Sequence, residues 1–144
     1  MDYSSYQTLR FSRENAILTV ALNRPEQLNS VDHVMHEELA QVFTDIQNDD
    51  ETEVAVLTGT GRAFCAGGDL KEMEDSAQRG KPLLLRRPDA KRIVFSMLDL
   101  EKPIIARING HAMGLGATIA LLCDVTFMAD AAKIGDPHVK AGVA

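Results

Sequence analysis

The chain has 144 residues, of which 45% are hydrophobic and 25% are charged, as in an ordinary globular domain. This length allows one substantial core but not two normal domains, so we expect a single domain over residues 1–144. The formal net charge of −6 argues against nonspecific binding to nucleic acid or to an anionic membrane, because both need a basic surface. We therefore expect neither as a partner.

Cysteine content and hydropathy favour a cytoplasmic protein. Cys65 and Cys123 are too few for a disulfide framework or a four-ligand zinc site, and we expect both to be reduced and buried. Residues 1–13 are polar and lack the apolar region of a secretory signal. The apolar stretch from Ala112 to Cys123 has 12 residues, too few to span a bilayer.

The first half of the chain alternates strand and helix patterns. The β-branched run Ile17–Leu22 predicts a strand, after a more polar candidate strand at Thr8–Ser12. Asp32 is a candidate N-cap for a helix of about four turns. The apolar face expected for this helix consists of Met35, Leu39, Val42, Phe43 and Ile46.

The middle of the chain combines a strand, a polar segment and a second helix. The run Val54–Thr58 is apolar throughout and predicts a strand with both faces covered, as in parallel sheets. Residues 72–88 are polar and rich in helix breakers, so we expect an irregular, mobile surface segment. Asp89 is a candidate N-cap for the next helix. Its expected apolar face consists of Ile93, Val94, Met97 and Leu98.

Shorter elements follow in the last third. Ile104–Ile108 predicts a strand, Leu115–Leu122 a short helix entered through Gly114, and Val125–Met128 a further strand. The alternation of strands and helices along the chain indicates α/β layering.

Two glycine-rich loops carry most of the functional information. Residues 59–69 and 109–117 each follow an apolar strand and lead into a helix. This arrangement presents free backbone N–H groups at a helix N-terminus. Two such groups directed at one point would form an oxyanion hole. The alternative for either loop is tight chain packing around glycine.

Neither loop fits a nucleotide-binding motif. A G-x-G-x-x-G pattern that starts at Gly59 has Phe64 at its third glycine position, and one that starts at Gly114 has Ile119 there. The sequence contains no G-x-x-x-x-G-K-[ST] segment, which excludes a P-loop.

Several motifs in a fixed order resemble one known family. They are Leu22-Asn23-Arg24-Pro25 with Leu28-Asn29, Gly61–Leu70, Lys102–Ala106, Asn109–Gly114, Cys123-Asp124 and Ile134–Pro137. Together they resemble the enoyl-CoA hydratase/isomerase family, also called the crotonase family. The similarity runs from about Ile17 to the end of the chain and covers only the N-terminal part of the family domain. It implies an α/β fold made of a spiral of β-β-α units, here incomplete at its C-terminus.

The resemblance also implies a function and a site. Family members bind acyl-CoA thioesters, so coenzyme A is part of the substrate and no cofactor is permanently bound. Two backbone N–H groups hold the thioester carbonyl and stabilise an enolate, and the matching positions are Gly68 and Leu115. The expected coenzyme A contacts are Ala66, Gly68, Asp69, Leu70 and Lys71, with Arg24 at the phosphates. The family further implies a homo-oligomer, a trimer or a hexamer.

The chain departs from the family's hydratases at both catalytic glutamates. Motif matching places Thr118 at the first glutamate position and His138 at the second. Thr118 cannot act as a base at neutral pH without an activator, whereas His138 or the neighbouring Asp136 can. The alternative for His138 is a solvated loop histidine, and for Asp136 a turn residue before Pro137.

A metal site is not expected. His33 and His36, beside Glu37, share one predicted helix, and His111 could pair with His138, but neither set has a close third ligand.

Three hypotheses stay open. The first is an acyl-CoA enzyme of the family, a hydratase or, without the glutamates, an isomerase, hydrolase or other lyase. The second is a protein that has kept the coenzyme A site and lost catalysis. The third is a half-domain that needs a partner or its missing C-terminal part.

Overall fold

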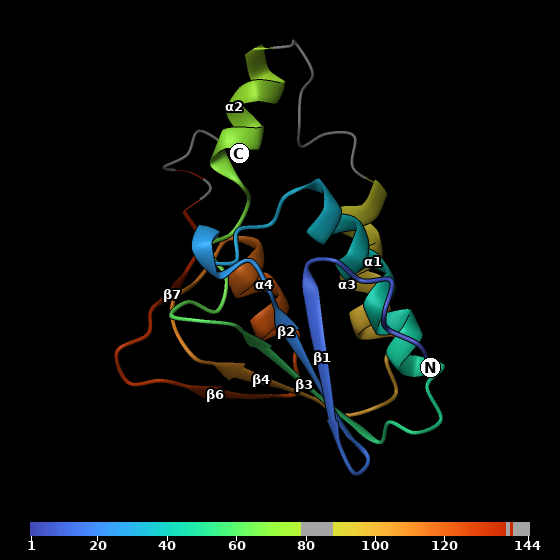
Figure 1. Cartoon of the computed structure of the whole chain (residues 1–144). Coiled ribbons are helices and arrows are strands. Elements are labelled where there is room, and N and C mark those ends of the chain that lie inside the picture. The colour runs from blue at the N-terminus through green and yellow to red at the C-terminus, as the bar shows by residue number, and fades with distance from the viewer. Residues whose placement is uncertain (79–87, 138, 140–144) are drawn as a thin grey trace.

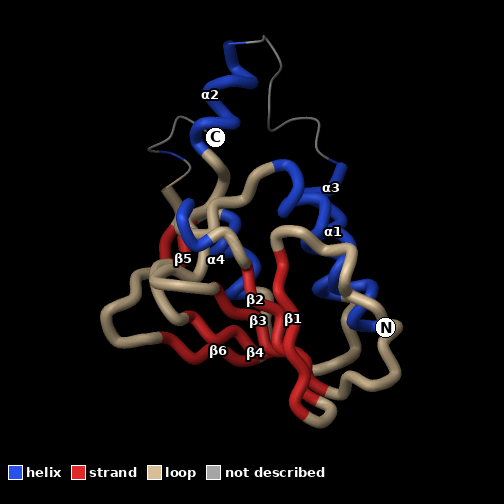
Figure 2. The backbone as a smooth tube through the Cα atoms, viewed as in Figure 1, coloured by secondary structure: helices blue, strands red, loops and turns tan. Residues whose placement is uncertain are grey.

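The structure, a computed structural model, describes residues 1–78, 88–137 and 139. Helices α1 and α3 lie side by side against one face of a β-sheet, so the fold has an α/β layer arrangement (Figure 1). Figure 2 shows how the strands gather into this sheet while loops and short helices connect their upper ends. Within the described residues, no helix is long and apolar enough to cross a membrane.

The main sheet has five strands in the order β1-β2-β3-β4-β6. β1 (Leu9–Glu14) and β2 (Ile17–Leu22) form an antiparallel hairpin. β3 (Val54–Gly59), β4 (Ile104–Ile108) and β6 (Val125–Met128) continue the sheet in parallel. All five strands lie where the sequence predicts them.

Helix α1 (His33–Gln47) begins as expected. The Met35 N–H donates to the Asp32 carboxylate at 2.9 Å, which makes Asp32 the N-cap. The whole predicted apolar face is buried: Met35, Leu39, Val42, Phe43 and Ile46. This face packs on the sheet and on α3 (Pro88–Leu98), which follows the undescribed residues 79–87.

The second helix differs from its prediction at both ends. α3 starts at Pro88, so Asp89 lies in its first turn and is not the N-cap. Proline suits a first helical position because its missing N–H would have no intrahelical partner there. Ile93 and Met97 are buried one turn apart, whereas Leu98 is 62% exposed. Leu98 lies about 100° around the helix from Met97 and therefore points to the surface.

The segment expected to be irregular from residue 72 is in part helical. α2 (Leu70–Gln78) is capped by the Asp69 carboxylate, which accepts a hydrogen bond from the Glu72 N–H at 3.3 Å. The remainder of the expected mobile segment, residues 79–87, lies outside the described residues.

The sheet is well covered on one face. In β3, Ala55 and Leu57 are buried beneath the helices, whereas Val56 on the opposite face is only half-buried. Every residue of β6 is exposed within the described part of the chain. The parallel pairing of β3 is confirmed, but the expected cover on both its faces is not, because α1 and α3 pack on the same side.

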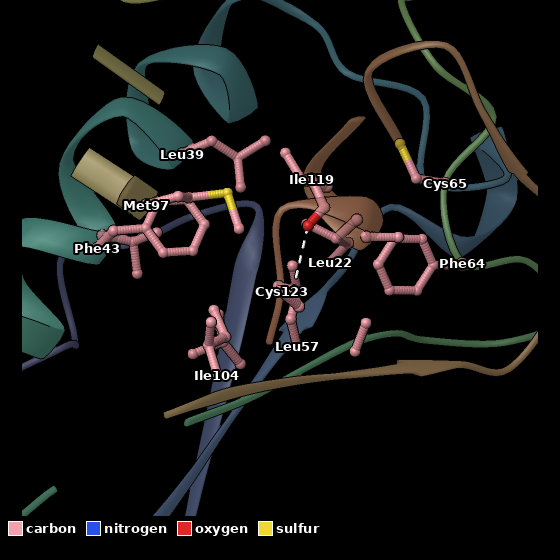
Figure 3. Packing of buried hydrophobic residues seen from close by; sticks show 14 of the residues in the cluster. Leu22, Leu39, Phe43, Leu57, Phe64, Cys65, Met97, Ile104, Ile119 and Cys123 are labelled. Carbon is pink, nitrogen blue, oxygen red and sulfur yellow. Dashed lines mark hydrogen bonds between the residues drawn. The ribbon is translucent and has the colours of Figure 1, made fainter. Parts of the chain in front are cut away.

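The core extends from the sheet to a fourth helix, α4 (Leu115–Leu121). Figure 3 shows Phe64 and Ile119 packed between the sheet and the loops. Cys65 and Cys123 are both free and buried, as predicted. The Cys123 thiol donates to the Ile119 carbonyl at 3.2 Å, which satisfies it inside α4's last turn (Figure 3).

Three short elements complete the fold. A 3-10 helix, η1 (Pro25–Gln27), follows β2. β5 (Ala112–Met113) and β7 (Ile134–Gly135) form a separate two-stranded parallel sheet. Sequence periodicity could not predict these strands, because two residues are too few for an alternating pattern.

Candidate functional site

The first glycine loop, residues 59–69, is held along its length by the segment that precedes α1. The Ala66 N–H donates to the Leu28 carbonyl at 3.0 Å, and the Val31 N–H donates to the Gly67 carbonyl at 2.7 Å. The Asp69 N–H returns a bond to the Val31 carbonyl at 3.0 Å. The end of the loop thus runs like a parallel strand beside this segment, with Gly68 opposite Val31.

Two asparagine side chains fix the entrance of the loop. Asn29 is fully buried and donates to the carbonyls of Thr60 and Ala63, each at 2.9 Å. Asn109 accepts from the Gly59 N–H at 3.0 Å and donates to the Gly61 carbonyl at 3.0 Å. The sequence analysis placed both asparagines in family motifs without giving either a role. Their buried amide contacts become visible only when the two loops are brought together.

The second loop, residues 109–117, adopts a backbone that suits glycine. Gly114 has a φ of 53° and precedes Leu115, the first residue of α4. Its N–H donates to the Gly135 carbonyl at 3.0 Å, so β7 supports the loop from the other side. The Thr118 N–H and hydroxyl both donate to the Gly114 carbonyl, at 3.0 and 3.3 Å.

The two loops pack against each other. The Met113 N–H donates to the Cys65 carbonyl at 2.8 Å. A Cβ atom on Gly67 would lie 2.9 Å from the Met113 carbonyl oxygen and 3.7 Å from the Gly114 Cα. A Cβ atom on Gly116 would lie 2.6 Å from the Cys65 Cβ. The loops therefore need glycine at both contacts, because any side chain would force them apart.

The packing brings two backbone donors to adjoining positions. Gly68 directly follows Gly67 and Leu115 directly follows Gly114, and these two preceding glycines are in contact. Neither the Gly68 N–H nor the Leu115 N–H has a hydrogen-bond partner among the residues that the structure describes. For Gly68 this follows from strand alternation, because the next N–H, of Asp69, is the one that faces Val31. For Leu115 it follows from its place at the start of a helix.

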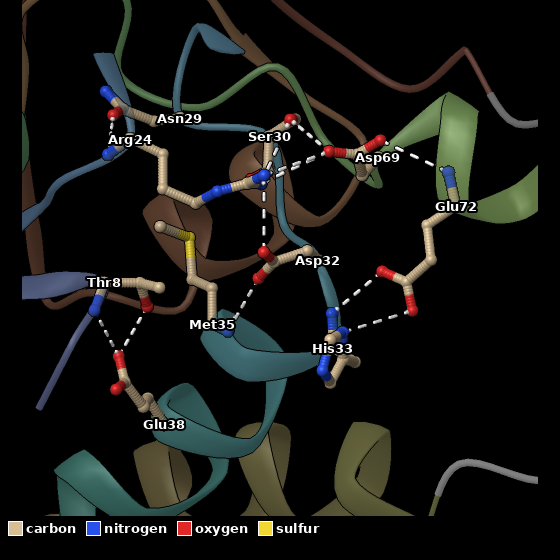
Figure 4. A network of polar contacts seen from close by, with 10 residues as sticks. All are labelled: Thr8, Arg24, Asn29, Ser30, Asp32, His33, Met35, Glu38, Asp69 and Glu72. Atoms are coloured by element: carbon tan, nitrogen blue, oxygen red, sulfur yellow. Dashed lines mark hydrogen bonds and ion pairs between the residues drawn. The ribbon is translucent and has the colours of Figure 1, made fainter. Parts of the chain in front are cut away.

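A cluster of charged side chains lies beside the first donor (Figure 4). Arg24 pairs with Asp69 and with Asp32, each at 3.3 Å. The Ser30 hydroxyl also donates to Asp69, at 3.1 Å. Burial by itself would raise the pKa of Asp69, but the bonds from the Glu72 N–H, Ser30 and Arg24 lower it below its ordinary value. Asp69 is therefore charged at neutral pH.

The residues expected to contact coenzyme A lie on and after the first loop. Ala66 is half-buried, Gly68 is exposed, and Lys71 is exposed in the first turn of α2, which begins at Leu70. Arg24 differs from a free phosphate ligand, because its guanidinium already lies between two carboxylates.

The positions of the missing glutamates lie around the second loop. Thr118 is exposed on the first turn of α4, with its hydroxyl bonded to the Gly114 carbonyl. Asp136 is exposed and follows β7, whose Gly135 contacts Gly114 through the backbone. His138 lies outside the described residues.

The remaining reactive side chains have other surroundings. Burial raises the pKa of the Cys65 thiol to about 11, so this cysteine is neutral at physiological pH. His111 accepts from the Lys133 N–H at 3.0 Å, and the His33 ring faces Glu72 at 3.7 Å. Over residues 1–78, 88–137 and 139, no three histidine, cysteine or acidic side chains are grouped so that they could hold a metal ion.

A surface hollow lies away from both loops, between α1 and α3. It contains no residue of either glycine loop, and we assign it no role. Its lining consists of Ala40, Phe43, Thr44, Gln47, Asn48, Arg92, Phe95, Ser96 and Asp99.

Comparison with known proteins identifies the fold first. A crystal structure of an enoyl-CoA hydratase/isomerase from Mycobacterium paratuberculosis superposes with a TM-score of 0.86 at 35% sequence identity. The match covers 97% of this chain and 56% of that one. The chain therefore has the α/β crotonase fold, as far as it extends.

The sequence places the chain within this fold class. Residues 12–144 match the family described as enoyl-CoA hydratase/isomerase, and the chain belongs to that family. It is 35% identical over 134 residues to a short-chain-enoyl-CoA hydratase from Clostridium acetobutylicum, covering 91% of this chain and 50% of the relative. It is 37% identical over 132 residues to a 1,2-epoxyphenylacetyl-CoA isomerase from Escherichia coli, with coverages of 90% and 50%. The chain spans about half the length of the curated relatives it matches.

Proposed function

We propose that the chain binds acyl-CoA thioesters and holds the thioester carbonyl between the N–H groups of Gly68 and Leu115. The observation that carries this proposal is the contact between the two glycine loops, with both donors free of partners among the described residues. A thioester carbonyl gains negative charge as its enolate forms. Fixed donors in a dry site stabilise such charge by about 3 kcal/mol each.

The coenzyme A portion would lie along Ala66, Gly68, Asp69, Leu70 and Lys71, at the start of α2. Lys71 is exposed there and offers a cation to a phosphate. The names of the relatives support the substrate class, because the hydratase and the isomerase both act on coenzyme A derivatives.

A titration tests this proposal directly. We expect acetyl-CoA to bind more tightly than S-ethyl-CoA, a thioether that lacks the carbonyl oxygen but keeps the rest of the ligand. Two hydrogen bonds to a neutral carbonyl predict a preference of roughly tenfold to a hundredfold. Equal affinities would contradict the two-donor assignment, and no affinity for either ligand would contradict coenzyme A binding.

The reaction itself divides into two candidates. A family enzyme other than a simple hydratase is favoured by Asp136, a carboxylate next to the second loop, with His138 as the alternative base. A binding protein without catalysis is favoured by Thr118, whose hydroxyl is occupied by the Gly114 carbonyl. Turnover of crotonyl-CoA, measured beside the acetyl-CoA titration, separates the two. Binding with no turnover of any tested thioester supports the second.

A further inference from the structure

Arg24 occupies a position that a simple surface cation does not. Its side chain is only 18% exposed, and its guanidinium contacts three groups from three places in the chain. It pairs with Asp69 after the first loop and with Asp32 at the start of α1, and it donates to the Ser30 carbonyl (Figure 4). A planar guanidinium with several donors in a fixed fork can serve three acceptors at once, which a lysine ammonium on its flexible stem does less well.

These contacts surround the peptide that carries the first donor. Asp69 is bonded twice, through its N–H to the Val31 carbonyl and through its carboxylate to Arg24. Ser30, whose carbonyl also binds Arg24, is the neighbour of Val31. Arg24 therefore joins the two chain segments on which the orientation of Gly68 depends, from the side opposite its free N–H.

The charges suit this internal role better than phosphate binding. One guanidinium faces two carboxylates, Asp32 and Asp69, so its positive charge is balanced within the protein. A coenzyme A phosphate would have to displace one of them and leave a half-buried carboxylate without its partner.

We propose that Arg24 is a positioning residue that fixes the direction of the Gly68 N–H by holding Asp69 and Ser30 together. This role rests on the proposed acyl-CoA function. It does not require Arg24 to touch the ligand.

The test uses the unmodified full chain and acetyl-CoA labelled with 13C at its carbonyl. Hydrogen bonds from Gly68 and Leu115 should move the bound carbonyl resonance downfield in the unmodified chain. In Arg24→Gln we expect most of this displacement to be lost. The preference for acetyl-CoA over S-ethyl-CoA should fall about threefold to tenfold, the equivalent of one hydrogen bond. Affinity for coenzyme A itself, which has no carbonyl at this point, should change less than about twofold.

A matched control and a second variant keep the result interpretable. Arg13→Gln breaks another ion pair, to Asp49 at 2.5 Å, at the opposite end of α1. We expect it to lower stability without changing the carbonyl resonance. Arg24→Lys keeps the charge but loses the fork, and its displacement should lie between those of the unmodified chain and Arg24→Gln. It replaces Arg24→Gln if that variant does not fold.

The outcomes separate the two proposals. A carbonyl displacement that survives unchanged in both Arg24 variants overturns the positioning role alone. Loss of coenzyme A affinity in parallel with acetyl-CoA affinity overturns it too, because Arg24 would then be a ligand contact. No displacement in the unmodified chain contradicts the proposed function and removes this role with it.

Discussion

At the scale of single residues, the candidate site depends on backbone groups more than on side chains. Gly68 contributes an N–H that faces away from Val31, and Leu115 contributes one that no preceding helical turn can bind. Side chains act around these donors. Asn29 and Asn109 fix the first loop, and Arg24 holds Asp69 beside it.

The donor role of Gly68 can be tested with two substitutions. Gly68→Pro removes the N–H, and we expect the preference for acetyl-CoA over S-ethyl-CoA to fall about threefold to tenfold. Gly68→Ala keeps the N–H and is the matched control, with little expected change. Calorimetric titration of both variants measures the difference. A proline variant that keeps the full preference would place the donor elsewhere.

Thr118 tests the position of the first missing glutamate. If this residue faces the acyl group, Thr118→Glu supplies a carboxylate for general acid or base catalysis, which typically contributes about 10²–10⁴-fold. We expect crotonyl-CoA hydration to rise by about tenfold or more, since the second glutamate is still missing. Thr118→Gln has the same size without the charge and should not raise the rate. An equal effect of both variants would exclude catalysis by the carboxylate.

At the scale of elements, the two glycine loops behave as one unit. The segment before α1 holds the first loop, β7 holds the second, and direct contacts join the two loops. The donors are therefore positioned by tertiary contacts rather than by either loop alone.

Gly67 is the position where this contact can best be disturbed. Its φ is 89°, and a Cβ atom would lie 2.9 Å from the Met113 carbonyl oxygen. We expect Gly67→Ala to lower the free energy of unfolding by about 1–3 kcal/mol and to weaken acetyl-CoA binding. The control is Gly135→Ala, whose Cβ would only meet the Met113 sulfur at 3.7 Å. Urea denaturation should show a change below about 0.5 kcal/mol for this control.

At the scale of the whole molecule, the ends of the described fold are held by different means. Asp49, which is fully buried at the end of α1, accepts hydrogen bonds from Arg13, Tyr3 and Thr52. At the other side of the sheet, β6 is an exposed edge within the described residues.

Asp49 should make stability depend on pH in the acid range. Burial opposes its charge, but the bonds from Thr52, Tyr3 and Arg13 dominate and lower the pKa of Asp49 below its ordinary value. Its contribution is thus complete above about pH 4, the unfolded pKa of an aspartate, and is lost as the pH falls further. Asp49→Asn should cost about 2–4 kcal/mol at pH 7 and flatten this acid dependence. Thermal unfolding from pH 2 to pH 7 measures both, with the exposed Asp50→Asn as a control.

The exposed strand predicts self-association. β6 places Val125, Phe127 and Met128 on the surface at 48%, 64% and 44% exposure, and Leu121 of α4 is 67% exposed nearby in sequence. An edge strand with apolar side chains is a template for pairing and burial. We expect sedimentation at roughly 10 µM to show oligomers, and Phe127→Lys to reduce them. A stable monomer would contradict the expected homo-oligomer.

The sequence by itself determined the main elements. Local signals, namely the β-branched run of β2, the Asp32 cap and the 3-4 spacing of α1, fixed five strands and the first helix. Ordered motifs also determined the family, because they are features of the linear chain. The sequence erred where burial depends on neighbours: Leu98 is exposed, and β3 is well covered on one face.

Only the tertiary structure decided how the candidate site is assembled. Gly67 touches Gly114, Asn29 reaches Ala63, and Arg24 meets Asp69 across long separations in sequence. None of these contacts has a local periodic signal, since each depends on how β3 and β4 are placed side by side in the sheet. A backbone N–H carries no sequence signature of its own. Whether it is free to bind a ligand is set by which neighbouring carbonyls the fold leaves within reach.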